Sequence, residues 1–390
     1  MFDWIKSLFS PRLYPMNIVY VHRKNILRNM EYLQSLQPNS SLFPVLKSNA
    51  YGHGIKQMIK ILSKIDVPYV VVDSYPEYQI LKKNSDKQIL IIWETLPDNY
   101  KKFDLKRTAF AVYNIEALEA LGRIGKNVRI HVFLNTGMNR EWVDPDKLAS
   151  FMEVCLKYKT IEIEWVMSHL YWADDIEFIA DLDKEIGGEK SSIEKQIELF
   201  KKMYYQILEY GYSPLRRHIG NSAGMFKIKE DFFNARRPGL AMYGYNPLAE
   251  DDPYFFLGKK LSPALSITSR VVSLHEVWPG EGISYWHKHV VKDREIVATV
   301  PFGYAEWLSR LSSGKIYFGI GKKSVQQLGT ICMNLCSFLA DDSIEIGDEI
   351  EIISCNNKNK NTLLALAKAS ETIPYECLIR FDRGMRREII

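Results

Sequence analysis

Residues Leu42–Gly54 read LFPVLKSNAYGHG, an apolar run that ends in Lys47 and passes into a loop of small and polar residues with two glycines. The run has the composition of a buried β-strand. An amine at the end of such a strand, partly walled by apolar groups, has its pKa lowered by desolvation. A neutral amine is what a Schiff base with an aldehyde requires, although a lysine at a strand end is more often solvated surface. Tyr51 follows within one turn, where its hydroxyl can donate to a phosphate.

Seven further β-rich runs follow the first, and helical patterns separate them. Ser192–Glu209 shows the helical spacing clearly, since apolar residues recur every three or four positions along it. Strands that alternate with helices form parallel sheets, and eight such units favour a closed (β/α)8 barrel over a doubly wound open sheet. The eight runs are Leu42–Leu46, Tyr69–Val72, Ile89–Trp93, Ala109–Tyr113, Val128–Leu134, Ile161–Met167, Arg217–Ile219 and Ala235–Leu240.

The composition changes near Asn246–Pro263, a stretch with Pro, Asp and Gly that is typical of a linker. Short alternating runs punctuated by Gly and Asp follow it, which indicates a mostly β domain. These runs are Ser266–Val272, Glu295–Val300, Ile316–Ile320, Gly329–Met333 and Glu349–Ile353, with one short helix expected at Thr362–Ala369. We therefore predict an α/β chain with an N-terminal extension over residues 1–15, a TIM-like (β/α)8 barrel over 16–255 and a β-rich C-terminal domain over 256–390.

Bulk properties narrow the classes of function. The formal net charge is +4 and the basic residues are spread along the chain, whereas nucleic-acid-binding proteins concentrate them. The five cysteines form no CxxC pair, so neither a zinc site nor a disulfide framework is expected, and a reducing compartment fits. No run of about 18 apolar residues occurs. We therefore expect a cytoplasmic protein without a metal, a membrane segment or a nucleic-acid partner.

The segment LKSNAYGHG resembles the lysine segment of alanine racemases, members of the barrel group also called fold type III, whose pattern reads roughly VKANAYGHG. The resemblance implies that Lys47 binds pyridoxal 5'-phosphate (PLP) and that Tyr51 contacts the phosphate of this cofactor. Further segments match in the family's order, so that the resemblance covers residues 16–390 and leaves out only the N-terminal extension.

Two segments that follow predicted barrel strands resemble parts of the family that handle the substrate. Leu134–Arg140, LNTGMNR, is similar to KVDTGMGR, which implies that Arg140 contacts the substrate carboxylate. A guanidinium suits that task because it presents a planar fork of donors. Met167–Ala173, MSHLYWA, resembles the sixth-strand segment, which implies that His169 hydrogen-bonds the catalytic tyrosine and tunes its pKa.

Two later segments resemble the family's cofactor-binding parts. They are His218–Ala223, HIGNSA, and Arg237–Gly244, RPGLAMYG. Backbone N–H groups suit a phosphate because they bring partial positive charge without bulk. The phosphate cradle that the two segments imply consists of Asn221, Ser222 and the backbone N–H groups of Gly239 and Leu240.

The resemblance places Arg237 against the pyridine nitrogen of PLP, with His218 as its hydrogen-bonding support. This position leads to an expectation about the mechanism. A carboxylate in this place would keep the nitrogen protonated, whereas a permanently charged guanidinium disfavours a pyridinium. A carbanion is then less delocalised into the ring, which limits side reactions such as transamination.

The second domain contributes three implied site residues. Gly280–Tyr285, GEGISY, resembles the stretch that ends in the catalytic tyrosine, so Tyr285 is the expected second base. An unperturbed tyrosine has a pKa of about 10, so neighbours must poise it. FGYAEWLSR and GTICMN resemble segments that border the substrate, which implies that Tyr304 lines the entry and that Met333 limits substrate size.

The resemblance implies a two-base racemisation of L- and D-alanine, with Lys47 serving the D-face and Tyr285 the L-face. In such enzymes the tyrosine comes from the partner subunit, so a head-to-tail homodimer with shared sites and a small amino-acid substrate is expected. A broad-spectrum racemase, or one for serine, lysine or arginine, would use the same pair. A fold type III decarboxylase, a PLP carrier and a barrel without PLP are further alternatives. Arg237 argues against a decarboxylase, and the presence of the second domain argues against a PLP carrier.

Several positions depart from the family's pattern. Phe133 stands where many racemases have a lysine that is carbamylated to orient the arginine, so Arg140 must be held by another group, such as a bound anion or Asn135. Asn135 and Asn334 stand where aspartate is common. In having asparagine there the chain resembles broad-spectrum amino-acid racemases, which also lack the modified lysine. Arg383 aligns near a phosphate-contacting tyrosine, and its role stays open.

Overall fold

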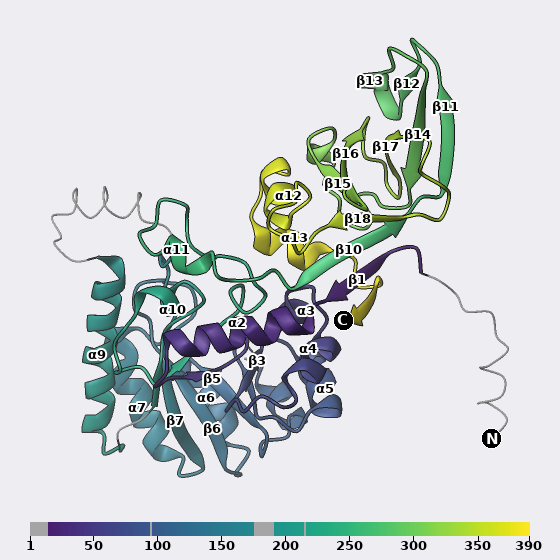
Figure 1. The fold of residues 1–390 in the computed structure, drawn as a ribbon. Coiled ribbons are helices and arrows are strands. Elements are labelled where there is room, and N and C mark those ends of the chain that lie inside the picture. Colours follow the sequence, from purple (N-terminus) through teal and green to yellow (C-terminus); the bar gives the residue numbers. More distant parts are fainter. Residues whose placement is uncertain (1–14, 94–95, 175–190, 214–215) are drawn as a thin grey trace, which may run out of the picture. The chain divides into compact units, whose positions relative to one another are not determined.

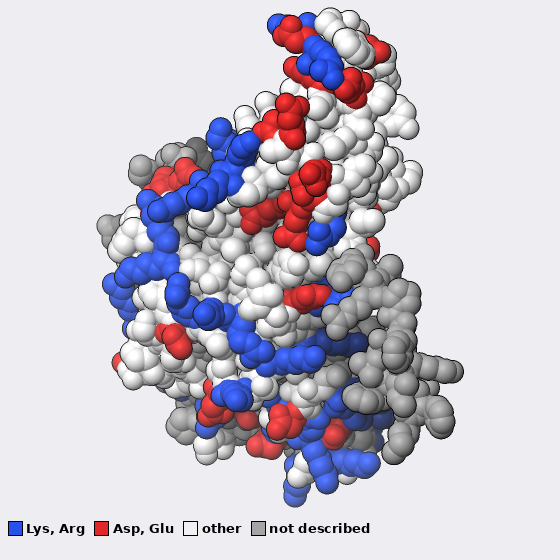
Figure 2. Space-filling view, turned by 45° about the vertical axis from the view of Figure 1, so that its right-hand side comes forward, with Lys and Arg blue, Asp and Glu red and all other residues white. Residues whose placement is uncertain are grey.

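The computed structural model describes residues 15–93, 96–174, 191–213 and 216–390 (Figure 1). Contacts between Cα atoms divide the chain into two compact units. One consists of Arg23–Ala264, and the other joins Leu265–Ile390 to the residues up to His22. Among the described residues, no helix is both long enough and apolar enough to cross a membrane. Figure 2 shows Lys and Arg spread over the face that it draws, with Asp and Glu among them.

The unit Arg23–Ala264 is built on a parallel sheet with the strand order β2-β9-β8-β7-β6-β5-β4-β3. Its eight strands are β2 (Ser41–Leu42), β3 (Val70–Val72), β4 (Ile89–Ile91), β5 (Thr108–Val112), β6 (Val128–Phe133), β7 (Ile161–Met167), β8 (Arg216–His218) and β9 (Ala235–Arg236). The segment after β2 closes the ring, because Leu46 N–H donates to Val71 O at 2.8 Å and Val71 N–H donates to Pro44 O at 2.9 Å. Each predicted run overlaps one of these strands, so the TIM-like barrel is confirmed and the open sheet is excluded.

Helices separate the strands along the chain and surround the sheet (Figure 1). They are α2 (Arg23–Leu36), α4 (Ile55–Leu62), α5 (Tyr75–Asn84), α6 (Ile115–Gly122), α7 (Leu148–Lys157), α9 (Ser192–Glu209), α10 (Gly224–Lys227) and α11 (Phe255–Gly258). The bounds of α9 agree with the prediction. Ser191 begins this helix with a capping box: its hydroxyl accepts from the Glu194 N–H, and the Glu194 side chain accepts from the Ser191 N–H.

Aromatic and imidazole rings fill part of the barrel interior. Phe43 packs edge-on against Trp165, with ring centres 4.9 Å apart, and against His218 at 5.3 Å. His131 and His218 both have no exposed surface. Because buried polar groups need hydrogen-bond partners, two histidines in this core indicate a polar network inside the barrel.

The second unit is a mostly antiparallel sheet with the strand order β11-β14-β17-β16-β15-β18-β10-β1-β19, beside the hairpin β12-β13. The strands are β1 (Ile18–Val21), β10 (Leu265–Arg270), β11 (Ser273–Val277), β12 (Gly282–Ile283), β13 (His289–Val290), β14 (Glu295–Val300), β15 (Tyr317–Ile320), β16 (Lys323–Leu328), β17 (Cys336–Ala340), β18 (Glu349–Ile353) and β19 (Arg386–Ile389). Helices α12 (Leu363–Ala369) and α13 (Pro374–Arg380) follow β18. The prediction that the C-terminal part of the chain folds mostly as β-strands is therefore confirmed.

Two sequence-based expectations differ from the structure. The predicted strand Gly329–Met333 does not form, because β16 ends at Leu328 and β17 begins only at Cys336. Gly329 turns with a φ of 66°, and a Cβ on it would lie 2.7 Å from Ile283 O, so the backbone leaves the sheet where it passes β12. In addition, β1 pairs with β10 and β19, although its residues are predicted to belong to the barrel. That pairing joins segments far apart in the sequence, which local patterns do not show.

Candidate active site

Lys47 stands at the start of a left-handed turn, α3 (Lys47–Tyr51). The four residues after it have φ between 51° and 55°, a region that costs an ordinary residue about 1–2 kcal/mol. Side chains hold the turn: Asn49 N–H donates to Glu77 Oε1 at 2.9 Å, and Ile55 N–H donates to Asn49 Oδ1 at 3.0 Å. Such strain persists only where the surroundings determine it, so the turn presents the lysine in one fixed place.

The Lys47 amine lies above the ring of Trp93, with Nζ 4.4 Å from the ring centre. Burial lowers the pKa of Lys47; Asp73 opposes this shift, and the positive charge of Arg140 adds to it. A larger share of the amine is therefore neutral than in an exposed lysine, as the sequence analysis expects for a group that must act as a nucleophile or base.

The residues of the predicted phosphate cradle meet after β8 and β9. Ser222 Oγ accepts hydrogen bonds from Gly239 N–H at 2.9 Å and from Ala241 N–H at 3.2 Å, with buried Leu240 between them. Tyr51 is also buried, and a Cβ on Gly239 would lie 2.6 Å from its hydroxyl oxygen. A hydroxyl and a phenol, both donors that suit a phosphate, thus converge where only a glycine fits, beside backbone N–H groups that hold the hydroxyl in place.

The side chain of Asn221 is hydrogen-bonded to a different segment from the side chain of its neighbour Ser222. Its Oδ1 accepts a hydrogen bond from Gly224 N–H at 2.9 Å, at the start of α10. The side chain therefore shapes the turn that presents Ser222, and a contact between Asn221 and a phosphate stays a prediction.

Arg237 is buried and binds groups from two neighbouring strand ends. It donates to His218 Nδ1 at 2.5 Å, to Ser168 O at 2.6 Å and to His169 Nδ1 at 3.3 Å. The predicted support from His218 is thus present, and His169 joins the same group. Burial, followed by the charge of Arg236, lowers the pKa of Arg237 to about 9. Burial and the charge of Arg237 hold the pKa values of His169 and His218 well below the usual value, so both rings stay neutral.

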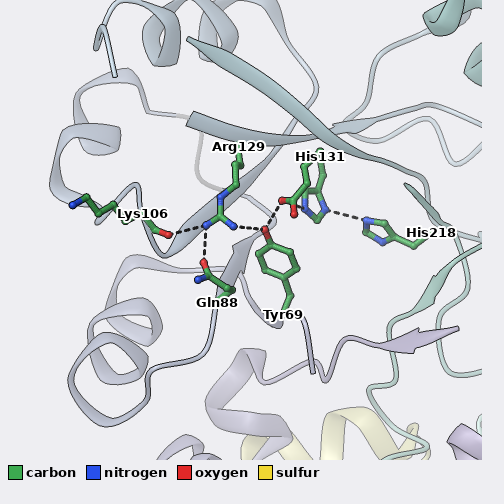
Figure 3. Close-up of polar contacts among 7 residues, drawn as sticks. Tyr69, Gln88, Lys106, Arg129, His131 and His218 are labelled. Atoms are coloured by element: carbon green, nitrogen blue, oxygen red, sulfur yellow. Dashed lines mark hydrogen bonds and ion pairs between the residues drawn. The ribbon is translucent and has the colours of Figure 1, made fainter. Parts of the chain in front are cut away.

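Polar contacts continue from His218, the partner of Arg237, through the barrel core (Figure 3). His218 Nε2 lies 3.0 Å from His131 Nδ1, and His131 Nε2 lies 3.9 Å from Glu164 Oε2. Glu164 accepts from the Tyr69 hydroxyl, which also accepts from Arg129 at 3.0 Å. Hydrogen bonds therefore join the guanidinium beside the predicted cofactor ring to His131, whose Nε2 faces a carboxylate on β7 at 3.9 Å, beyond hydrogen-bond distance.

The loop after β6 carries Arg140. Asn135 shapes this loop, because its Nδ2 donates to Asn139 Oδ1 at 2.9 Å and to Asp144 Oδ1 at 2.7 Å. Asn139 has a φ of 54°, a conformation that asparagine tolerates better than most residues. Arg140 donates instead to Glu141, with Nη2 2.8 Å from Oε1. The hypothesis that Asn135 itself holds Arg140 is therefore replaced by an indirect role in the loop.

Three predicted residues of the second unit lie close together in that unit. Thr330 Oγ1 donates to Tyr285 O at 3.0 Å, while Tyr304 N–H donates to Cys332 O at 3.0 Å, next to Met333. The side chains are open to solvent: Tyr285 is 64% exposed, Met333 57% and Tyr304 41%. All three side chains are therefore accessible in this unit.

Two family models match the chain, "Alanine racemase, N-terminal domain" over residues 21–247 and "Alanine racemase, C-terminal domain" over residues 264–389. The chain belongs to the alanine racemase family. Alanine racemases are isomerases, so the class of enzyme that the sequence implies is confirmed.

Relatives and solved structures agree with this assignment to the alanine racemase family. The chain is 30% identical over 376 residues to alanine racemase 1 of Clostridium acetobutylicum, covering 94% of this chain and 93% of the relative. It is 28% identical to the alanine racemase of Geobacter sulfurreducens, covering 91% and 92%. The structure of alanine racemase from Streptomyces lavendulae matches with a TM-score of 0.86 at 25% identity, over 97% of this chain and 98% of that one. The Bacillus anthracis alanine racemase with bound L-Ala-P matches with a TM-score of 0.85 at 26% identity, over 97% and 96%.

The structure of this alanine racemase family member adds polar residues that the sequence analysis does not identify. His131 and Glu164 interrupt the apolar runs of β6 and β7, and that interruption is a signal that sequence reasoning can use. Trp93 and Glu141 give no comparable signal, because their contact joins two loops that only the fold brings together.

Proposed function

We propose that this protein interconverts L- and D-alanine with PLP as its cofactor and with Lys47 and Tyr285 as the two bases. The observation that carries the proposal is the left-handed turn that presents Lys47 in the same barrel as the Ser222–Gly239 cradle and buried Arg237. The similar curated proteins are named alanine racemases, which favours alanine over serine, lysine or arginine.

The barrel residues fit PLP. Their assignments are Lys47 to the aldehyde carbon, Arg237 to the ring nitrogen, and Tyr51, Ser222 and the N–H groups of Gly239 and Leu240 to the phosphate. When bound, PLP supplies an electron sink that stabilises a carbanion at the substrate's α-carbon. The Arg237 guanidinium stays charged at neutral pH, because its lowered pKa of about 9 still lies above 7. A positive charge there disfavours a second positive charge on the adjacent ring nitrogen.

The two bases would move the α-proton on opposite faces of the substrate. Lys47 Nζ would take or return it on one face and Tyr285 Oη on the other. Arg140 would bind the carboxylate, and Tyr304 and Met333 would border the entry. Because Tyr285 is 64% exposed, we propose that a partner subunit covers this side chain and that the active form is a homodimer with shared sites.

We also propose that the enzyme works in the cytoplasm. Its five cysteines are unpaired, and three of them are buried as thiols. Free thiols persist in a reducing compartment, whereas oxidising compartments favour disulfides.

The central test compares the unaltered protein with two variants. Lys47→Ala should abolish the visible absorption of the bound cofactor. Tyr285→Phe should keep that absorption but lose turnover from L-alanine, because phenylalanine has no hydroxyl to carry the proton. The measurement is the uptake of solvent deuterium into each enantiomer of alanine, with serine, lysine and arginine as comparison substrates. Full activity of Tyr285→Phe in both directions would contradict the two-base assignment, and a colourless protein that ignores added PLP would contradict the cofactor.

A further inference from the structure

Arg140 contacts three side chains that the proposed mechanism does not use, those of Glu141, Trp93 and Trp142. Its Nη2 donates to Glu141 Oε1 at 2.8 Å, and its Nε also contacts the Glu141 carboxylate. The guanidinium carbon lies 5.5 Å from the ring centre of Trp93 and 5.6 Å from that of Trp142. A carboxylate therefore binds one edge of the guanidinium, and two aromatic rings flank it.

Trp93 and Glu141 also bind each other. The indole N–H of Trp93 donates to Glu141 Oε1 at 3.0 Å, so one carboxylate oxygen receives donors from both the indole and the guanidinium. The Glu141 side chain is only 16% exposed, while that of Arg140 is 49% exposed, so the carboxylate is the more enclosed partner of the pair. Charge-assisted hydrogen bonds of a partly buried carboxylate have a defined geometry, whereas exposed pairs between flexible side chains contribute little.

Phe133 contacts Trp142, one of the two rings that flank Arg140. The centres of the Phe133 and Trp142 rings lie 5.1 Å apart, and both residues belong to a buried cluster with Ala111 and Met167. Because Phe133 has no charged group to offer the guanidinium, its effect on Arg140 passes through the Trp142 ring. An aromatic support and a neighbouring carboxylate thus replace a direct polar contact from position 133.

We propose that Glu141 and Trp93 are positioning residues, which hold Arg140 so that its free edge can receive the carboxylate of the substrate. This inference rests on the proposed function. Glu141 uses the Nε and Nη2 edge of the guanidinium, and the terminal edge, formed by one N–H of Nη1 and the second N–H of Nη2, can bind a second carboxylate. The Trp93 ring centre also lies 4.4 Å from Lys47 Nζ, so the same indole contacts both the lysine and the arginine.

The test measures alanine kinetics and carboxylate binding on the PLP-loaded enzyme. Glu141→Ala should raise KM for both enantiomers about tenfold, because the guanidinium loses its charged partner, with a much smaller change in kcat. Trp93→Phe keeps an aromatic face and loses only the N–H, so it should raise KM by a smaller factor. Propionate, a carboxylate without an amine, should bind more weakly to Glu141→Ala by the same factor in calorimetry.

The matched control is Glu116→Gln, because Glu116 lines the same cavity as Arg140 and Glu141. It removes a negative charge there and should leave KM and propionate affinity unchanged. Wild-type KM and propionate affinity in Glu141→Ala would overturn the inference; should that variant not fold, Glu141→Gln decides by the same criterion. An unaltered protein that does not racemise alanine would instead refute the proposed function, and the propionate measurement would still decide whether Glu141 positions Arg140.

Discussion

At the scale of single residues, the identity of Arg237 determines where the ring protons of two histidines lie. Arginine only donates hydrogen bonds, so the Nδ1 atom of His218 that faces it must accept. The ring proton of His218 then lies on Nε2 and points to His131 Nδ1, 3.0 Å away. His131 in turn carries its proton on Nε2, on the side of Glu164. One donor-only residue therefore orients two neutral imidazoles, the second of which faces a carboxylate 3.9 Å away.

These buried imidazoles make stability depend on pH. Burial lowers the pKa of His131 and of His218, so below about pH 6.5 the unfolded chain binds more protons than the folded chain. Their contribution is therefore complete above that pH and is lost on acidification. His131→Asn keeps an acceptor opposite His218 and removes one titrating group.

We expect thermal melting of this variant to show a shallower fall in Tm between about pH 7 and about pH 5 than the unaltered protein. His275→Asn, at an exposed position, should retain the original slope. Equal slopes for all three proteins would show that His131 does not contribute to the acid sensitivity.

At the scale of elements, the candidate site is assembled at the ends of barrel strands. The turn after β2 presents Lys47, the segment after β7 presents His169, and the turns after β8 and β9 present Ser222 and Arg237. In barrels of this kind the chemistry lies at the carboxyl ends of the strands, because the loops there are free to vary while the strands hold them in place. Neighbouring strands thus bring their end residues within hydrogen-bonding distance.

Gly239→Ala tests how tightly the turn after β9 packs on the turn after β2. The added Cβ would lie 2.6 Å from the Tyr51 hydroxyl oxygen, so one of the two segments must shift. We expect the Kd for PLP, measured by titration of the apoprotein, to rise about tenfold, equivalent to ~1.4 kcal/mol. The further change Tyr51→Phe removes the clashing oxygen and should restore the melting temperature of the apoprotein in part. Unchanged PLP affinity in Gly239→Ala would mean that this cradle is not rigid.

At the scale of the whole molecule, the second unit exposes several large side chains. Tyr285 and Met333 are among them, and so is Trp286, which follows Tyr285 in the sequence, is 70% exposed and has Arg310 4.4 Å from its ring centre. Exposed aromatic and apolar groups that gather in one place mark interaction surfaces. A second copy of the chain is the occupant that the proposed shared site requires.

Hybrid dimers test the shared site directly. Lys47→Ala and Tyr285→Phe should each be inactive alone with L-alanine. When subunits of the two variants are exchanged, one site of each hybrid combines an intact Lys47 with an intact Tyr285 from the other subunit. Activity should therefore return in part, as measured by deuterium uptake into L-alanine. A mixture that sediments as hybrid dimers yet stays inactive would show that the two residues do not meet across subunits.

The sequence by itself determined the eight strand positions of the barrel, the bounds of α9 and the candidates Lys47 and Arg237. These features depend on residues close together in the chain, where periodicity, capping and short motifs act. Only the tertiary structure decided the pairing of His131 with His218, 87 positions apart, and that of Trp93 with Glu141, 48 positions apart. It also decided that β1 joins the sheet of the second unit. Such contacts depend on which strands become neighbours when the ring and the sheet close, and no local pattern encodes that choice.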